Sequence, residues 1–178
     1  GVLKIMVVGG SLGARVLNEC LPAALALLPF ESRPKLVHQT GRQHVAEVRQ
    51  LYRKAQVHAE VVDFIDDMAA RYADVDLVIC RAGAITVTEL TSAGVASILV
   101  PFIASSTSHQ RDNALFMDRE GAAIHLPQSE LTPEFLARLL KDMTRKKCME
   151  MAKKAYSLGK RDANERIAEV LIRTINRK

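Results

Sequence analysis

Several residue types that mark particular classes of protein are scarce or missing in this 178-residue chain. It has no tryptophan, only 4% of its residues are aromatic, and no run approaches the roughly 18 consecutive apolar residues of a membrane-spanning helix. Residues 1–8 lack the charged start and long apolar centre of a secretion signal. We therefore expect a protein that works in the cytoplasm, in solution or at a membrane surface.

Cysteine is also sparse, with Cys20, Cys80 and Cys148 odd in number, far apart and in no metal-ligand spacing. This argues against a disulfide framework and against a zinc site. We expect buried or neutral thiols in a reducing compartment.

The excess of positive charge lies in the last part of the chain. Residues 141–178 carry 12 of the 25 Lys and Arg and 5 of the 20 Asp and Glu, a net charge of +7, which leaves −2 for residues 1–140. The basic segment contains no aromatic residue except Tyr156 and no nucleic-acid motif. We expect a solvated helix face there, with attraction to a membrane surface as the alternative, and no nucleic-acid partner.

Short apolar runs alternate with amphipathic stretches along the first 126 residues. The predicted strands are 3–8, 35–38, 57–62, 76–80, 97–101 and 122–126. The predicted helices are 14–28, 43–54, 68–72, 86–93, 113–119, 132–144, 146–158 and 163–176, and Thr132 before Pro133 is typical of a helix start. The alternation predicts an α/β fold, a Rossmann-like parallel sheet flanked by helices, in a single domain over residues 1–178.

Ligands of such sheets bind beyond the carboxyl ends of the strands, where helix amino termini point free amides at them. Residues 9–14, Gly-Gly-Ser-Leu-Gly-Ala, follow the first strand and open the first helix. Glycines such as Gly13 allow a sharp turn close to a phosphate, and Ser11 adds a hydroxyl donor. The loop matches neither the dinucleotide fingerprint nor a Walker loop, so redox cofactors and ATP are disfavoured, although a plain tight turn also fits.

A second glycine-bearing turn, residues 80–89, follows the fourth strand. The amides of Ala84, Ile85 and Thr86 are placed to face an anion. Glu89 has two interpretations: Thr86-x-x-Glu89 forms a capping box, which the local pattern favours, or the carboxylate accepts both hydroxyls of a ribose.

The polar residues 105–113 follow the fifth strand and suit sugar hydroxyls. Alternatively this stretch is a solvated connection in which Asp112 or Asn113 caps the next helix, with His109 at the surface. Two acidic pairs are not expected to bind a metal ion. Asp74 and Asp76 lead into the amino end of the fourth strand, and Asp66 and Asp67 are expected to start a helix, with Asp66 as its cap. We predict no catalytic metal.

Together, residues 9–14, 64–68 (Phe-Ile-Asp-Asp-Met), 80–86, 100–102 (Val-Pro-Phe) and 109–114 resemble the donor-binding, C-terminal domain of the MurG family of GT-B-fold glycosyltransferases. Order and spacing match across nearly the whole chain. The family adds GlcNAc from UDP-GlcNAc to a lipid-linked MurNAc-pentapeptide in peptidoglycan synthesis. The resemblance implies that the chain forms one half of a GT-B enzyme.

The resemblance also implies roles for single residues. The diphosphate is expected at Ser11, Gly13 and the turn after the fourth strand, uracil at the Ile65 backbone, and ribose at Glu89, which displaces the capping interpretation. The expected substrate-binding residues are Ser11, Gly13, Ile65, Arg81, Ala84, Ile85, Thr86, Glu89, His109, Gln110 and Asn113. Gln110 and Asn113 are expected on the GlcNAc hydroxyls. The family often has Gln where His109 stands, and residues 103–108 carry less charge than its relatives.

The chain starts directly on a strand, so we expect a piece of a longer protein whose N-terminal half supplies the acceptor site, the membrane-facing apolar patch and the general base. The complete enzyme is then expected to be inverting and metal-independent, without a cofactor, peripheral at the cytoplasmic face of the inner membrane, and to form lipid II from lipid I. This chain alone is expected to be inactive. Two alternatives stay open: a UDP-GlcNAc 2-epimerase-like domain, and a non-catalytic UDP-sugar-binding subunit that needs a partner chain.

Overall fold

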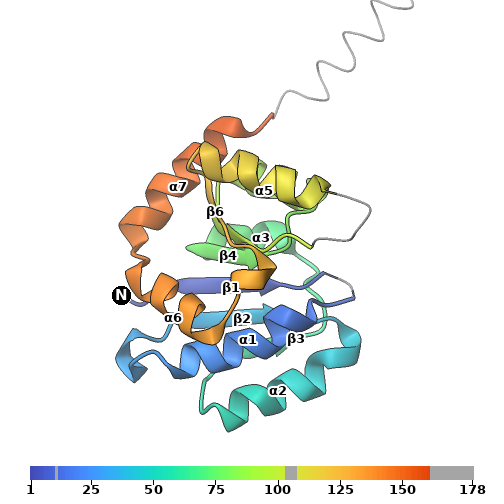
Figure 1. Ribbon diagram of the computed structural model, residues 1–178, viewed down its shortest axis with the longest axis vertical. Helices are drawn as coiled ribbons and strands as arrows, with labels where there is room; N and C mark the ends of the chain where they lie inside the picture. Colours follow the sequence, from blue (N-terminus) through green and yellow to red (C-terminus); the bar gives the residue numbers. More distant parts are fainter. Residues whose placement is uncertain (11, 103–107, 161–178) are drawn as a thin grey trace, which may run out of the picture.

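A six-stranded parallel sheet organises the molecule (Figure 1). This computed structural model describes residues 1–10, 12–102 and 108–160, so Ser11 and the predicted helix 163–176 lie outside the described residues. The strand order is β3-β2-β1-β4-β5-β6. The strands are β1 (Lys4–Val8), β2 (Lys35–Gln39), β3 (Glu60–Val62), β4 (Leu77–Cys80), β5 (Ala96–Leu99) and β6 (Ala123–His125). The predicted Rossmann-like parallel sheet is confirmed.

Helices connect successive strands and then close the fold after β6. They are α1 (Arg15–Ala26), α2 (Val45–Lys54), α3 (Met68–Asp74), α4 (Ala84–Ala93), α5 (His109–Arg119), α6 (Pro133–Asp142) and α7 (Arg145–Leu158). Three 3-10 turns accompany them: η1 (Phe30–Ser32), η2 (Arg42–His44) and η3 (Gln128–Glu130). The Thr132 hydroxyl accepts from the Phe135 amide at 3.2 Å, which confirms the predicted start of α6.

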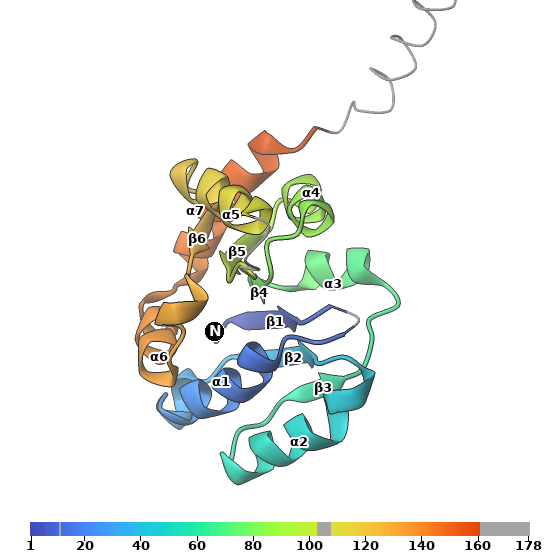
Figure 2. The ribbon, with the colours of Figure 1, turned by 45° about the vertical axis from the view of Figure 1, so that its right-hand side comes forward.

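Helices cover both faces of the sheet (Figure 2), and a hydrophobic core lies on each face. Alternate residues of each strand face opposite sides, so Ile5 and Val7 pack under α1, α2 and α6, whereas Met6 packs under α3, α4 and α5. Helix α7 contributes to both cores, with Cys148 in the first and Ala155 in the second. A sheet covered on both faces explains why its central strands are continuously apolar in sequence.

Three predicted boundaries were wrong. Strand β3 starts at Glu60 rather than at residue 57, because Gln56 reverses the chain with a φ of 54° and pairing with β2 begins only at Val37 and Glu60. Helix α4 starts at Ala84 rather than at residue 86, and α5 starts at His109 rather than at residue 113. In both helices the polar residues expected at the cap lie inside the first two turns.

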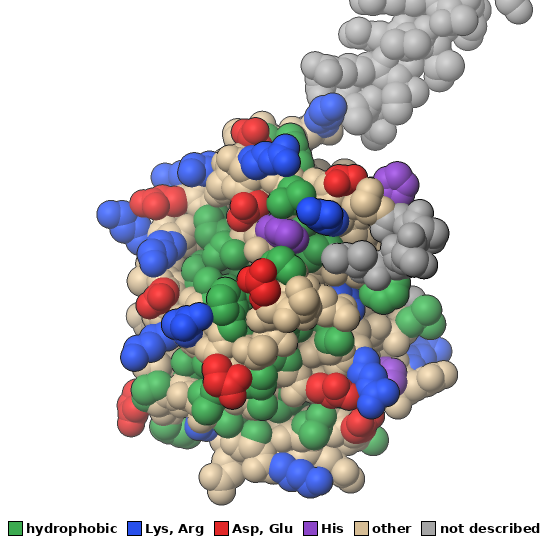
Figure 3. Space-filling model, viewed as in Figure 1, with side chains coloured by type: hydrophobic (Ala, Val, Ile, Leu, Met, Phe, Trp, Pro, Cys, Tyr) green, Lys and Arg blue, Asp and Glu red, His purple; other side chains and the backbone are tan. Residues whose placement is uncertain are grey.

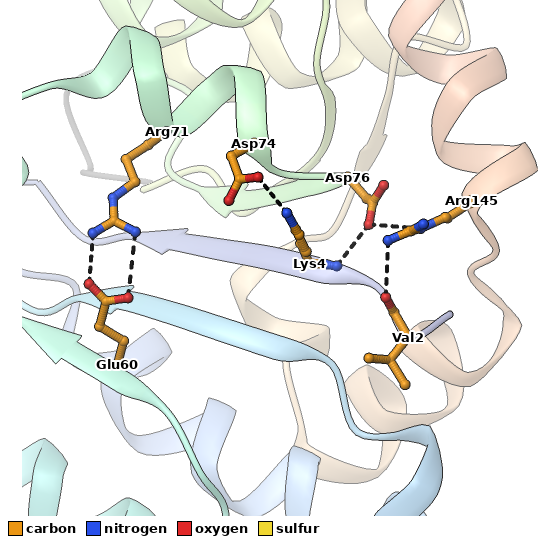
Figure 4. A network of polar contacts seen from close by, with 7 residues as sticks. All are labelled: Val2, Lys4, Glu60, Arg71, Asp74, Asp76 and Arg145. Carbon is orange, nitrogen blue, oxygen red and sulfur yellow. Dashed lines mark hydrogen bonds and ion pairs between the residues drawn. The ribbon is translucent and has the colours of Figure 1, made fainter.

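The amino edge of the sheet is held together by ion pairs and backbone contacts (Figure 4). Asp76 accepts from the Lys4 amide at 2.8 Å and from Arg145 Nε at 3.3 Å, and Asp74 pairs with the Lys4 ammonium. Arg145 Nη2 also donates to the Val2 carbonyl at 3.4 Å. Asp74 and Asp76 therefore join β1, β4 and α7 at the edge opposite the predicted site.

The three cysteines are buried and free, as expected. Burial raises the pKa of Cys20 and Cys148 to about 11 and that of Cys80 to about 12, so the thiols stay protonated at neutral pH. On the face of the molecule seen in Figure 3, Lys and Arg side chains alternate with Asp and Glu. Among the described residues, no helix has the length and apolar character needed to cross a bilayer.

Candidate functional site

The strand order reverses direction between β1 and β4, because the chain moves outward from β1 to β3 and then returns to β4 on the other side. In an open α/β sheet, the turns after two such strands diverge, and the carboxyl edge between them is the usual place for a ligand. We call this edge, between the turns after β1 and β4, the crevice. The turn after β1 leads into α1, and the turn after β4 leads into α4. Two of the predicted motifs thus flank one crevice.

The amino termini of α1 and α4 differ from those of several other helices. Side chains cap α3, α6 and α7, whereas Ala14 and Gly83 at the caps of α1 and α4 provide no capping side chain. Neither α1 nor α4 has an acidic residue in its first turn. Free first-turn amides and the positive end of the helix dipole favour an anion between these helices.

The glycine loop rests on the carboxyl end of β2. A side chain at Gly13, where φ is +77°, would bring its Cβ within 2.2 Å of the Thr40 carbonyl oxygen. One at Gly41 would lie 2.7 Å from the Gly13 amide nitrogen. The two segments approach so closely that only glycine fits at the contact, which fixes the height of the loop above the sheet.

The turn after β4 is anchored by Arg81. Its Nη1 donates to the Val100 carbonyl at 3.1 Å and to Gln128 Oε1 at 2.8 Å, and the guanidinium lies 5.4 Å from the centre of the Phe102 ring. Partial burial lowers the pKa of Arg81. Arg81 thus ties β4 to β5 and η3, and its predicted contact with substrate stays a prediction.

Beyond this turn, Ala84 and Ile85 are exposed and Thr86 is half-buried in the first turn of α4, where the phosphate was expected. Ile85 is 77% exposed, and Leu12, on the other side of the crevice, is 88% exposed. One exposed apolar side chain thus lies on each side of the crevice.

The capping box at Glu89 was wrong. Helix α4 begins two residues before Thr86, and the Glu89 carboxylate lies in its second turn, where Oε2 accepts from the Tyr72 hydroxyl of α3 at 3.0 Å. Burial, and then the charge of Glu89, raise the pKa of Tyr72, which keeps the phenol protonated as a donor. Glu89 is an exposed carboxylate with one oxygen oriented by a neighbouring helix, and its ribose role stays a prediction.

Gln110 and Asn113 do not cap a helix or extend freely into solvent. Gln110 Oε1 accepts from the Ala82 amide at 3.3 Å and from the Phe102 amide at 2.9 Å. Asn113 Nδ2 donates to the Ala82 carbonyl at 2.9 Å. The predicted cap at Asp112 or Asn113 was wrong, since both lie within α5 and its N-cap is Ser108.

The first turn of α5 is thereby bound to the turn after β4, with Gln110 and Asn113 close to the crevice. Gln110 Nε2 and Asn113 Oδ1 make no hydrogen bond with another residue that the structure describes, and the predicted contacts of both residues with sugar hydroxyls stay predictions. His109 is exposed at the start of the helix.

The connection from β3 to α3 provides the third side of the crevice. Ile65 is only 8% exposed and belongs to the same hydrophobic core as Tyr72, and the predicted contact of its backbone with uracil stays a prediction. Phe64 is 52% exposed. The predicted cap of α3 at Asp66 was wrong by one residue, because the Ala70 amide donates to Asp67 Oδ1 at 2.9 Å.

Sequence reasoning missed Gln39 and Tyr72. Gln39 lies 29 residues from the glycine loop and hydrogen-bonds to it, and Tyr72 lies 17 residues from Glu89. The sequence does contain one sign that the end of β2 approaches another segment closely, namely the glycine just past the strand in Gln39-Thr40-Gly41. The sequence contains no comparable sign for Tyr72.

A hollow of about 560 Å³ lies at the opposite edge of the sheet, lined by Lys4, Phe30, Lys35, Glu60, Arg71 and other residues. Helix carboxyl termini, however, meet the sheet at this edge and disfavour anions. Arg71 already pairs with Glu60 at 2.7 Å there. We therefore place the site at the carboxyl edge. Among the described residues, no three His, Cys, Asp or Glu side chains are grouped to hold a metal ion.

Comparison with known proteins places this arrangement in a family. The profile of the family described as "Glycosyltransferase family 28 C-terminal domain" matches residues 4–167. The chain belongs to this glycosyltransferase family. Membership agrees with the resemblance to MurG and with the GT-B half that it implied.

Two curated relatives share the name UDP-N-acetylglucosamine--N-acetylmuramyl-(pentapeptide) pyrophosphoryl-undecaprenol N-acetylglucosamine transferase. The one from Herminiimonas arsenicoxydans is 65% identical over 171 residues, and the one from Janthinobacterium sp. (strain Marseille) is 61% identical over 171 residues. Each alignment covers 96% of this chain and 48% of the relative. The chain thus spans about half the length of these relatives.

Solved structures agree on the fold. The crystal structure of Acinetobacter baumannii MurG is 42% identical, with a TM-score of 0.89, and the match covers 97% of this chain and 50% of that one. The glycosyltransferase VinC, solved with DTDP, has a TM-score of 0.66 at 21% identity and shows likeness of fold alone. The prediction of a GT-B glycosyltransferase half is confirmed.

Proposed function

We propose that this chain is the donor-binding domain of an N-acetylglucosaminyltransferase and that it holds UDP-GlcNAc at the crevice between α1 and α4. The observation that carries the proposal is the pair of amino termini without side-chain caps or first-turn acids on either side of the strand reversal. The names of the curated relatives supply the sugar nucleotide and the lipid-linked MurNAc-pentapeptide acceptor.

The proposed chemistry is stabilisation of the leaving group. A base in another part of the full-length protein activates the acceptor hydroxyl, which attacks the anomeric carbon opposite UDP with inversion. Negative charge grows on the β-phosphate as that bond breaks, and amides held at α1 and α4 stabilise it in the transition state. Preset amide dipoles act in place of a metal ion in this proposal.

The proposed donor contacts follow the geometry of the crevice. The glycine loop and the first turn of α4 face the diphosphate, the Ile65 backbone faces uracil, and Glu89 faces the ribose. Gln110 and Asn113 offer an amide donor and an amide acceptor to the sugar. Because the acceptor is lipid-linked, we propose that the full-length protein works at the cytoplasmic face of the inner membrane.

Isothermal titration calorimetry of the 178-residue chain tests the donor assignment. We expect binding of UDP and UDP-GlcNAc, unchanged between EDTA and Mg²⁺, and no binding of ATP or NAD. Incubation with UDP-GlcNAc and lipid I is expected to give no transfer by this chain alone. Binding of ATP or NAD without UDP would overturn the proposal, and release of an epimerised sugar would support the epimerase alternative instead.

A further inference from the structure

Gln39 at the end of β2 connects two loops that no other described side chain joins. Its Oε1 accepts from the Gly10 amide at 3.2 Å, and its Nε2 donates to the Gly10 carbonyl at 3.2 Å and to the Asp63 carbonyl at 3.4 Å. The backbone adds a fourth contact, in which the Gly9 amide donates to the Gln39 carbonyl at 3.0 Å. The side chain is only 4% exposed.

These contacts use both donors and the acceptor oxygen of one amide side chain. Both Nε2 protons and the Oε1 acceptor have partners, and two of the three bonds go to the peptide groups of a single residue. Gly10 has a φ of +79°, in the left-handed region, where a glycine peptide has many alternatives in the absence of a restraint. The Gly13 amide also donates to the Gly10 carbonyl at 3.0 Å, and Gln39 adds the restraints that come from outside the loop, so that the Gly10 peptide is held in one orientation.

The two loops correspond to different parts of the proposed ligand. Gly10 belongs to the loop that leads into the free amides of α1, whereas Asp63 lies two residues before Ile65. A neutral amide is suited to this position, since a carboxylate would place negative charge beneath the diphosphate and an ammonium could not accept from Gly10. The chemistry of the side chain agrees with its place between an anion site and a base site.

We propose that Gln39 is a positioning residue that sets the glycine loop at a fixed distance from the 63–65 segment, so that the phosphate-binding amides are in place before UDP binds. This role rests on the proposed donor-binding function. Gln39 does not touch the ligand and acts through the Gly10 and Asp63 peptides. Without it, the loop must be ordered at the expense of binding free energy.

Gln39→Met, which has similar size but no hydrogen-bonding amide, tests the proposal by comparing UDP with uridine. We expect UDP affinity to fall roughly 10-fold, because the loop must then be ordered on binding. Uridine lacks the diphosphate, and its affinity, measured by NMR titration, is expected to change less than about twofold. A merely structural role would weaken both ligands alike, and that result would overturn the proposal.

Thr40→Val is the matched control, because Thr40 is also buried and its hydroxyl bonds only to the Gly41 and Val62 carbonyls. We expect it to lower the melting temperature while UDP affinity stays within about twofold. An equal loss of UDP affinity in the two variants would contradict a specific role for Gln39.

A second measurement needs no variant. In the ligand-free wild-type chain, we expect the Gly10 amide to exchange slowly with solvent in site-resolved hydrogen exchange, and UDP to slow it little further. If the Gly10 amide exchanges rapidly and becomes slow only with UDP, the loop is not ordered before UDP binds, and the proposed role of Gln39 is overturned even though UDP binds. A wild-type chain with slow Gly10 exchange but no affinity for UDP would instead overturn the proposed function, and with it the role of the loop in binding.

Discussion

Replacing Glu89 with glutamine tests the ribose assignment directly. Glu89 Oε2 accepts from the Tyr72 hydroxyl at 3.0 Å, which orients the carboxylate and leaves Oε1 for a ribose hydroxyl. Glutamine keeps the shape and a neutral acceptor but loses the charge. Since a hydrogen bond to a charged group contributes about 1.5 to 3 kcal/mol and a neutral one about 0.5 to 1.5 kcal/mol, we expect a loss of about 1 to 1.5 kcal/mol. This equals a fall in UDP affinity of roughly 5- to 15-fold.

The assay compares UDP with 2′,3′-dideoxy-UDP, which lacks both hydroxyls, by calorimetry. The dideoxy ligand is expected to bind Glu89→Gln and wild type within about twofold of each other, because it cannot use the carboxylate. Ser92→Ala, at an exposed position on the same helix, is the control and should leave both affinities unchanged. Tyr72→Phe frees the carboxylate to rotate and should weaken UDP by roughly two- to fivefold.

Equal effects of Glu89→Gln on the two ligands would refute this reasoning. If Glu89→Gln weakens UDP and the dideoxy ligand by the same factor, the carboxylate acts on the fold or on another part of the ligand. If it weakens neither, the oriented Oε1 does not meet the ribose.

Three further predictions concern stability, each measured as a free energy of unfolding in urea. Gly13→Ala should cost well over the ~1 to 2 kcal/mol of a left-handed alanine, because its Cβ would meet backbone oxygen at 2.2 Å, whereas Gly10→Ala, with no atom within 4 Å, should cost only that strain. Burial lowers the pKa of His38 from 6.5 to about 3, so as the pH falls this histidine binds a proton in the unfolded chain before it does in the folded chain. The contribution of neutral His38 to stability is therefore present above pH 6.5, and the free energy of unfolding should fall by about 2 kcal/mol between pH 7 and 5. His38→Phe should flatten this dependence. Leu21→Ala, at a fully buried site of α1, should cost about 3 to 5 kcal/mol, and Leu27→Ala, half exposed, less than about 1 kcal/mol.

The sequence predicted the sheet and the edge at which its glycine-bearing turns meet, because both follow from local pattern. Apolar runs alternating with amphipathic stretches require parallel strands and crossover helices, and glycine-bearing turns at strand ends then meet at one edge. The start of α6 at Thr132 and Pro133 could be predicted equally well, since the N-cap and the first-turn proline lie next to each other in the chain.

Prediction from local pattern failed where a residue distant in sequence forms the hydrogen bond instead. Thr86-x-x-Glu89 satisfies the capping-box pattern, yet Tyr72 occupies the Glu89 carboxylate and α4 begins before Thr86. Gln39 joins a loop 29 residues earlier in the chain, and its sequence neighbours do not reveal that contact. Side chains that hold the site were thus harder to predict than backbone segments that form it.

The two sides of the crevice are held by different parts of the fold. The glycine loop rests on β2 through Gln39 and Gly41, within a contact so close that only glycine fits. The turn after β4 is held by two side chains of α5, Gln110 and Asn113, which both bond to Ala82. In our proposal, substitutions on α5 change the groups offered to the sugar while the contacts of the glycine loop with Gln39 and Gly41 remain. In our proposal, sugar preference and diphosphate binding are separable for this reason.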